Sequence, residues 1–97
     1  MAHYILLATY TEQGIKGIKD TVKRTETVRE LAKKAGLAMK ESYWTLGAFD
    51  VVALFEAPDD ETMTAFSLSV AKLGNVKTQT LRAFTAKDMG GVLGKMV

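Results

Sequence analysis

The segment FDVVALFEA, from Phe49 to Ala57, constrains the fold most, because it is apolar on both faces of the strand that it predicts. Successive side chains of a strand point to opposite sides of the sheet. One side therefore carries Phe49, Val51, Ala53 and Phe55, and the other carries Asp50, Val52, Leu54 and Glu56. The segment from His3 to Ala8 is apolar on both sides in the same way. Such strands predict a sheet whose two faces are both covered.

The length and composition of the chain predict a single globular domain. Its 97 residues suit one hydrophobic core, and 47% hydrophobic with 25% charged residues is an ordinary globular composition. There is no cysteine, which excludes disulfides, thiol nucleophiles and Cys-ligated metals. We expect one domain over 1–97, with its core at about 3–88 and a flexible glycine-rich tail at 89–97. The composition favours a cytoplasmic protein.

The periodicity of apolar residues, together with the positions of glycines and helix-capping residues, predicts six elements in the order strand, helix, strand, strand, helix, strand. Strands are expected at 3–9, 37–46, 49–57 and 75–85, with a turn at Gly47 and Ala48. A helix is expected after Asp20, whose carboxylate can cap it, and ends at Gly36. The second helix begins beside Asp59 and ends at Gly74, and the tail forms at most one helical turn. This order predicts an α+β, ferredoxin-like βαββαβ fold with a four-stranded antiparallel sheet.

Each helix also has an expected apolar and polar side. The first should bury side chains from the set Val22, Thr25, Val28, Leu31, Ala32 and Ala35, and expose Lys23, Arg24, Glu26, Arg29, Glu30, Lys33 and Lys34. The second should bury Met63, Phe66, Leu68, Val70, Ala71 and Leu73.

Two helices can cover only one face of this sheet, so the other face would expose a contiguous apolar patch. The economical solution is a second copy of the chain that packs sheet to sheet. We therefore expect a homodimer or a higher oligomer. The sequence leaves open which face meets the helices.

The segments GAFDVVALFEAPDDE and LGNVKTQTLRAFT, with QGIKGIKD before the first helix, resemble the GYD-domain family of small uncharacterised proteins. The similarity covers about residues 3–88, and the family's Gly–Tyr/Phe–Asp feature corresponds to Gly47, Phe49 and Asp50. The resemblance implies a dimeric α/β barrel and carries no settled activity.

Asp50 and His3 are the candidate catalytic residues. Asp50 shares a strand face with Val52 and Leu54, and a carboxylate in a partly closed cavity has a raised pKa that suits acid–base catalysis. The structural alternative is an aspartate that accepts hydrogen bonds from backbone N–H groups near a turn. His3 is the only histidine. The alternative to a catalytic role is that His3 is a surface or packing residue.

Arg82 and Thr80 are candidate ligand-binding residues on the fourth strand. An arginine beside threonines can bind a carboxylate or phosphate in a bidentate manner. The alternative is an ion pair between Arg82 and Asp50 or Glu56.

Tyr10, Tyr43 and Lys16 complete the candidate ligand-binding set. The two tyrosines, with other aromatic side chains, would line a pocket for a flat apolar ligand, or would pack a dimer interface. Lys16 lies in QGIKGIKD, interpreted as a loop in which Gly14 and Gly17 permit unusual backbone angles. Such a loop near a helix N-terminus binds anions, covers a barrel mouth or simply connects two elements.

No metal or other cofactor is expected, because the carboxylates and the single histidine have no ligand spacing. The net charge of +2 does not favour nucleic acid, and no apolar run is long enough to span a membrane. The first hypothesis is a homo-oligomeric small-ligand-binding or assembly module. The alternative is a cofactor-independent enzyme, similar to a monooxygenase or isomerase, that acts on an apolar organic substrate. Whether the protein is an enzyme is left open.

Overall fold

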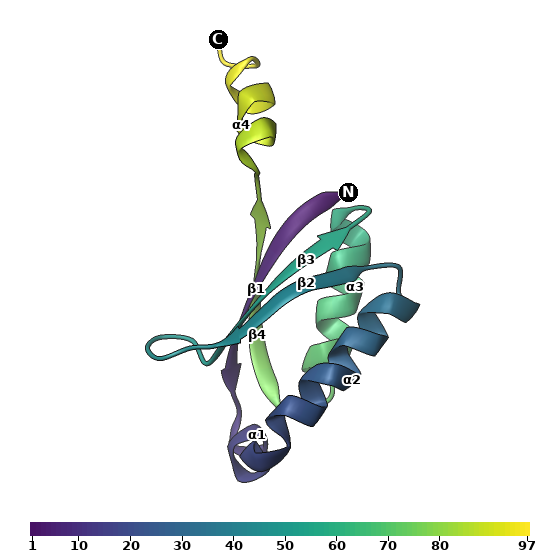
Figure 1. The fold of residues 1–97 in the computed structure, drawn as a ribbon, viewed down its shortest axis with the longest axis vertical. Helices are drawn as coiled ribbons and strands as arrows, with labels where there is room; N and C mark the ends of the chain where they lie inside the picture. Colours follow the sequence, from purple (N-terminus) through teal and green to yellow (C-terminus); the bar gives the residue numbers. More distant parts are fainter.

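The computed structural model describes residues 1–97. Its elements are β1 (Ala2–Tyr10), α1 (Glu12–Lys16), the 3₁₀ turn η1 (Ile18–Asp20), α2 (Thr21–Lys34), β2 (Ala38–Trp44), β3 (Val51–Ala57), α3 (Asp60–Ala71), β4 (Val76–Ala83) and α4 (Ala86–Leu93). The four strands form one sheet in the order β2-β3-β1-β4, and all three neighbouring pairs are antiparallel. The helices α2 and α3 lie on the same side of this sheet (Figure 1). The predicted α+β, ferredoxin-like fold is confirmed.

The two strands that are apolar on both faces, β1 and β3, occupy the centre of the sheet. Tyr4 lies opposite Phe55, and Leu6 lies opposite Ala53, and all four are buried on the face that meets the helices. The strand β2 is at an edge, as its imperfect alternation indicated, and its pairing with β3 shifts between Met39 and Glu41. Their central position pairs both edges of each strand, and the helices cover one of their two apolar faces.

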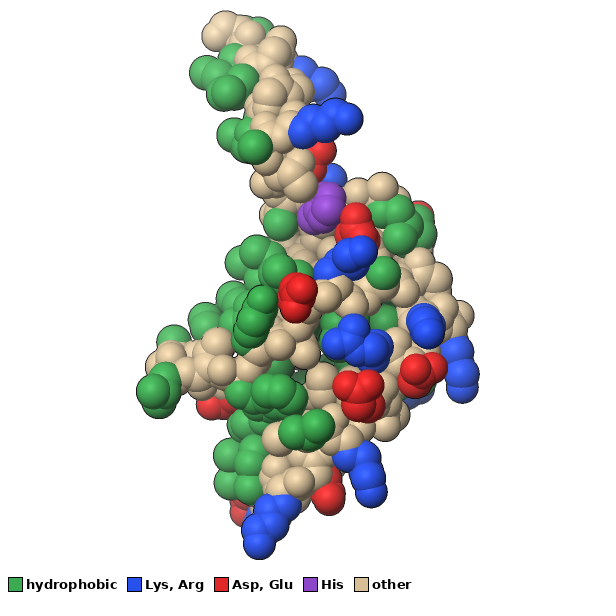
Figure 2. Space-filling model, in the orientation of Figure 1, with side chains coloured by type: hydrophobic (Ala, Val, Ile, Leu, Met, Phe, Trp, Pro, Cys, Tyr) green, Lys and Arg blue, Asp and Glu red, His purple; other side chains and the backbone are tan.

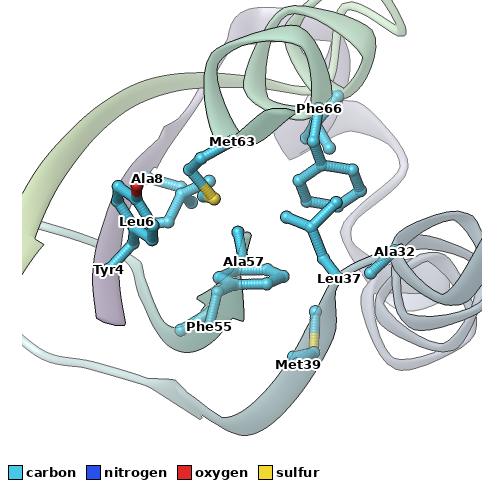
Figure 3. Close-up of a cluster of buried hydrophobic side chains, with 12 residues drawn as sticks. Tyr4, Leu6, Ala8, Ala32, Leu37, Met39, Phe55, Ala57, Met63 and Phe66 are labelled. Atoms are coloured by element: carbon cyan, nitrogen blue, oxygen red, sulfur yellow. The ribbon is translucent and has the colours of Figure 1, made fainter. Parts of the chain in front are cut away.

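The main core lies between the sheet and the helices, and Figure 3 shows Phe55, Leu37, Met63 and Phe66 pointing toward one another from the strands and helices around it. Phe55 from β3 packs against Phe66 from α3 with their ring centroids 5.3 Å apart. Met63 and Phe55 are almost fully buried. Aromatic pairs in such tilted contacts contribute beyond the area that they bury.

Glycines end both long helices as predicted. Gly36 and Gly74 have φ angles of 84° and 85°, in the left-handed region that favours glycine. Asp59 precedes α3, and its side chain accepts a hydrogen bond from the backbone N–H of Thr62 at 2.8 Å. This hydrogen bond lowers the pKa of Asp59 below its ordinary value. The negative charge is also favourable at the positive end of the helix dipole.

The segment between β1 and α2 is helical, so its prediction as an irregular loop is wrong. Thr11 caps α1 through a hydrogen bond from the N–H of Gly14, and η1 continues directly into α2. Gly14 and Gly17 do not have positive φ angles, so the backbone conformation does not require glycine at either position. Because η1 leads straight into the helix, Asp20 has φ −93° and ψ 5° rather than extended angles, and its carboxylate makes no capping hydrogen bond.

The predicted helix faces are partly wrong. Leu68 and Leu73 are 64% and 46% exposed, because α3 buries Met63, Phe66 and Val70 at the spacing of one helix side. On α2, Val22 is 60% exposed. Two arginines expected in solvent instead donate to backbone carbonyls in partly buried hydrogen bonds: Arg24 to Gly14 and Gly17, and Arg29 to Met39.

The C-terminal segment forms the helix α4, so the expectation of at most one turn is wrong. Thr85 and Asp88 make a capping box, in which the Thr85 hydroxyl accepts from the N–H of Asp88 and the Asp88 carboxylate accepts from the N–H of Thr85. These bonds lower the pKa of Asp88. The capping box starts the helix despite its two glycines, Gly90 and Gly91. Figure 1 shows α4 projecting beyond the end of β4, away from the sheet and the other helices.

A partly buried hydrogen bond from the Tyr4 hydroxyl to Oδ1 of Asp60, 2.5 Å long, links β1 to the first turn of α3. Tyr4 is only 4% exposed. Burial, together with this hydrogen bond, raises the pKa of Tyr4 from its ordinary value of 10.0 to about 12.

Tyr4→Phe is expected to lower the free energy of unfolding at pH 7 by about 1.5–3 kcal/mol, the range for hydrogen bonds to charged groups. Because the Tyr4 pKa is raised in the folded state, its contribution is complete below pH 10 and is lost as pH rises toward 12. The wild type should therefore lose more stability than Tyr4→Phe over that alkaline interval, as measured by urea unfolding at several pH values. Tyr43→Phe, at a tyrosine that is 53% exposed, is the matched control. Parallel pH profiles for the wild type and Tyr4→Phe would contradict this role.

Candidate functional site

Asp50 connects the end of β1 to the start of β3. Its backbone N–H donates to the carbonyl of Ala8 at 2.9 Å, and its Oδ2 accepts from the backbone N–H of Tyr10 at 2.9 Å. This is the geometry of the structural alternative, in which the carboxylate satisfies a backbone donor. Asp50 is half-buried and does not line the apolar cavity described below.

His3 lies at the other end of β1, so the two candidate catalytic residues are not brought together. His3 is opposite Glu56 on β3, and its Nε2 is 3.9 Å from a Glu56 carboxylate oxygen. Lys40 from β2 approaches the same carboxylate at 3.4 Å. The three side chains form a small charged group at the margin of the sheet.

Arg82 contacts aromatic rings and backbone carbonyls. Its guanidinium carbon lies 5.5 Å from the centre of the Tyr4 ring and 4.7 Å from that of Phe84. It donates to the carbonyl of His3 at 3.3 Å and to that of Ala83. The considered ion pair with Asp50 or Glu56 is absent, because Arg82 points to the helix side of the sheet near Tyr4. Thr80 is exposed on the same strand.

The remaining candidates lie in three different places. Tyr10 lines the cavity described below. Tyr43, which is 53% exposed, is opposite Val52 on the other side of the sheet. Lys16 is exposed on α1 and lies 3.3 Å from Glu12, so it makes a surface ion pair within one helix. The predicted ligand-binding residues therefore do not form one site.

An apolar cavity of about 150 Å³ lies between the sheet and the helices. Leu6, Ala8, Ala53 and Phe55 of the two central strands line its sheet side, and Val28 of α2 and Val70 of α3 line its helix side. The helix α2 packs mainly on β2, and α3 packs on β3 and β4. The short side chains Ala8 and Ala53 lie on the central strands beneath these two helices, and they leave the space unfilled.

Hydroxyl groups are gathered at one part of this cavity. The Tyr10 hydroxyl and Thr21 Oγ1 are 2.7 Å apart, and both residues line the cavity. Nε1 of Trp44 donates to the same Thr21 oxygen at 3.1 Å, which joins β2 to the start of α2. Arg24 also lines the cavity and is held by the carbonyls of Gly14 and Gly17. Sequence reasoning missed Thr21, Arg24 and Val28 as cavity residues, because the cavity depends on the fold that brings the short side chains Ala8 and Ala53 beneath the helices.

The sheet side away from the helices, termed the open face, is defined by Ile5, Leu7, Tyr43, Val52, Leu54 and Leu81. Leu54 lies opposite Ile5, which lies opposite Leu81 on β4, so apolar side chains cross three strands. None of the six is buried, and Leu81 is 46% exposed. The sheet thus has one covered and one uncovered apolar face.

The helix α4 carries a second apolar surface that no other element of the chain covers. Met89, Val92 and Leu93 are 41%, 40% and 57% exposed and recur at the spacing of one helix side. Figure 2 shows hydrophobic side chains along the side of the sheet away from α2 and α3, and again along the same side of α4.

The structure has no group of three or more histidine and carboxylate side chains that would hold a metal ion. None of its helices combines the length and the apolar character needed to cross a membrane.

The comparison with protein families settles where this sequence belongs. A model of the GYD domain matches residues 4–93. The chain belongs to the GYD-domain family. This confirms the resemblance recognised in the sequence, and the match covers nearly all of the sheet as well as α2, α3 and α4.

Similar proteins of known name or structure support this membership and the fold. The glutamine synthetase and cystathionine beta-lyase binding protein of Thermus thermophilus is 33% identical over 90 residues, which are 92% of this GYD-domain chain and 95% of that protein. The crystal structure of TTHA0845, also from Thermus thermophilus, matches with a TM-score of 0.59 and 24% identity, over 89% of this chain and 96% of that chain. The crystal structure of FFRP-DM1 matches with a TM-score of 0.64 and 17% identity, over 87% of this chain and all (100%) of that chain. The two structural likenesses establish the fold.

Proposed function

We propose that this GYD-domain protein is a homo-oligomeric, protein-binding assembly module. It associates with itself through the open face and binds partner enzymes through surfaces that remain outside that contact. The open face is the observation that carries the proposal. Six apolar side chains lie together on a sheet side that no helix covers.

The energetics of the open face favour a covering partner. Burying a large aliphatic side chain contributes about 1.5–3 kcal/mol relative to leaving it in water. Several such side chains together offset the loss of translational and rotational freedom on association. A second copy is the simplest partner, because packing two identical open faces buries both of them at once and leaves neither sheet exposed.

The partner enzymes are proposed from the relative in Thermus thermophilus, which is named for binding glutamine synthetase and cystathionine beta-lyase. The exposed apolar side of α4 supports a further contact beyond self-association. Met89, Val92 and Leu93 offer the kind of helical apolar stripe that inserts into a groove on another protein. We therefore propose that glutamine synthetase or cystathionine beta-lyase of the source organism is bound by this chain.

Leu54→Lys is expected to convert the oligomer to a monomer, because it places a charge at the centre of the open face. Light scattering coupled to size-exclusion chromatography should give at least twice the chain mass of 10.6 kDa for the wild type and a single chain mass for the variant. Leu68→Lys, at a leucine that is 64% exposed on α3, is the matched control and should keep the wild-type mass. A wild-type monomer at micromolar concentration would overturn the self-association.

Partner binding is tested separately by biolayer interferometry with each purified enzyme immobilised, and with an unrelated enzyme as control. Saturable binding to either named enzyme, and none to the control, supports the assembly role. Failure to bind both enzymes would remove this part of the proposal and would leave self-association to stand on the mass measurement.

The alternative function is a cofactor-independent enzyme for an apolar organic substrate, and the 150 Å³ cavity favours it. Its proposed catalytic residues have less support, because neither Asp50 nor His3 lines that cavity. A binding role for the cavity needs neither residue.

A further inference from the structure

The cavity between the sheet and the helices supports a role separate from self-association and partner binding. We propose that it is a specific site for one small organic molecule, about the size of a single aromatic ring and with one hydrogen-bond acceptor. This inference does not depend on the proposed assembly role, because no residue of the open face lines the cavity.

The size of the cavity sets the size of the ligand. An apolar protein cavity of about 150 Å³ is large enough to bind benzene. The cavity in this chain also measures about 150 Å³, and most of the residues that line it are hydrophobic. Leu6 and Ala53 from the sheet and Val28 and Val70 from the helices offer apolar contacts to both faces of a ring. Because the chain leaves this space unfilled, an apolar ligand gains contacts that the protein alone does not make.

The hydroxyl pair supplies the single polar contact. The hydroxyls of Tyr10 and Thr21 have two hydrogens between them, and one of these forms the 2.7 Å bond that joins the pair. Trp44 uses its own indole hydrogen to donate to Thr21. Whichever hydroxyl donates within the pair, one O–H hydrogen is left without a protein acceptor. Since both residues line the cavity, this hydrogen is available to an acceptor on the ligand.

Trp44 provides a direct readout of occupancy. It is the only tryptophan in the chain, and its indole nitrogen is bonded to a residue of the cavity wall. A ligand that engages the hydroxyl pair changes the environment of this indole, so its fluorescence reports binding.

The test is a titration of the full chain with toluene and with benzaldehyde, which have similar size but differ by one carbonyl acceptor. Binding is followed by Trp44 fluorescence and by ¹H–¹³C NMR of the valine and alanine methyl groups. We expect saturable binding of both probes, with a Kd of about 1 mM or tighter for molecules of this size. Benzaldehyde should bind roughly 3- to 10-fold more tightly, as one hydrogen bond of ordinary net strength allows.

Two sets of variants locate the site. Ala53→Leu fills the sheet side of the cavity and should weaken both probes at least 10-fold, whereas Val52→Leu places the same side chain on the opposite face and should not change binding. If Ala53→Leu fails to fold, Thr25→Leu on the helix wall replaces it. Tyr10→Phe combined with Thr21→Val removes both hydroxyls and should abolish the preference for benzaldehyde. Both changes are needed, because either hydroxyl alone still has a hydrogen to donate.

Absence of saturable binding of both probes to the wild type would overturn the proposal, as would equal binding to Ala53→Leu and Val52→Leu. Equal affinity of toluene and benzaldehyde for the wild type would overturn the assignment of the hydroxyl pair. The Leu54→Lys variant separates the two proposals: it should still bind toluene when monomeric, because the cavity lies on the other side of the sheet from Leu54.

Discussion

Phe55→Ala is expected to lower the free energy of unfolding by about 3–5 kcal/mol, the range for removing a buried phenylalanine ring. Phe55 is 2% exposed at the centre of the core, where its ring packs on Phe66 and faces Tyr4 across the central strand pair. Removing the ring loses its transfer free energy and leaves a space next to a cavity that already exists. The neighbouring side chains come from several different elements, so they cannot move together to fill it.

Urea unfolding followed by circular dichroism at equal protein concentrations measures this loss. Phe84→Ala is the matched control, because it makes the same substitution at a phenylalanine that is 50% exposed beyond the end of β4. Its loss should remain below about 1 kcal/mol, since little apolar area is involved and the contact with the Arg82 guanidinium is at the surface. Similar losses for the two variants would contradict the assigned core.

Gly14→Ala is expected to destabilise the protein by about 1–3 kcal/mol or more, although alanine normally favours a helix over glycine. A Cβ atom at Gly14 would lie 2.0 Å from the carbonyl oxygen of Asn75, which is a backbone atom and cannot rotate away. The same carbonyl accepts the N–H of Thr11, and the Thr11 hydroxyl donates to the carbonyl of Gly74 at 2.5 Å. The clash would therefore separate α1 from the connection between α3 and β4.

Gly17→Ala is the control for this prediction. The nearest atoms to a Cβ at Gly17 are 3.9 and 4.0 Å away, and its φ of −101° is open to alanine. Its stability should be unchanged or should increase by about 0.4–1 kcal/mol through the unfolded state. Thermal unfolding of the two variants compares them directly. Equal stability of Gly14→Ala and the wild type would show that the two segments are not packed as closely as described.

The candidate site shows where residue patterns stop being informative. The alternative enzyme hypothesis used Asp50, His3 or Arg82 in an apolar pocket. These residues do not converge on one pocket, and each contacts backbone groups or a neighbouring charged side chain. The cavity is instead lined by the small Ala8 and Ala53 and by residues of α2. A cavity forms where neighbouring side chains are too small to fill the space between elements. The sequence alone does not show which small residues of different strands will lie side by side.

Local signals in the sequence determined the four strands, the helices α2 and α3, and their order, although they missed α1, η1 and α4. Short, nearly continuous apolar runs identified β1 and β3, and the glycines that end α2 and α3 have the positive φ angles that only glycine adopts readily. The apolar character of both faces also indicated that the side away from the helices would be apolar, as Ile5, Leu7, Val52 and Leu54 on the open face are. The strand and helix segments and the helix ends depend on backbone conformation and hydrophobic periodicity within a few residues of the chain.

Only the tertiary structure decided which faces are covered and what each polar side chain contacts. Both faces of the central strands are apolar, so hydrophobicity did not distinguish them, and the choice depended on which face α2 and α3 could reach together. The arginines of α2 face carbonyls of Gly14, Gly17 and Met39 because helix packing brings these distant atoms within reach. The cavity and the open face arise in the same way, since both depend on how elements far apart in the chain pack against the sheet.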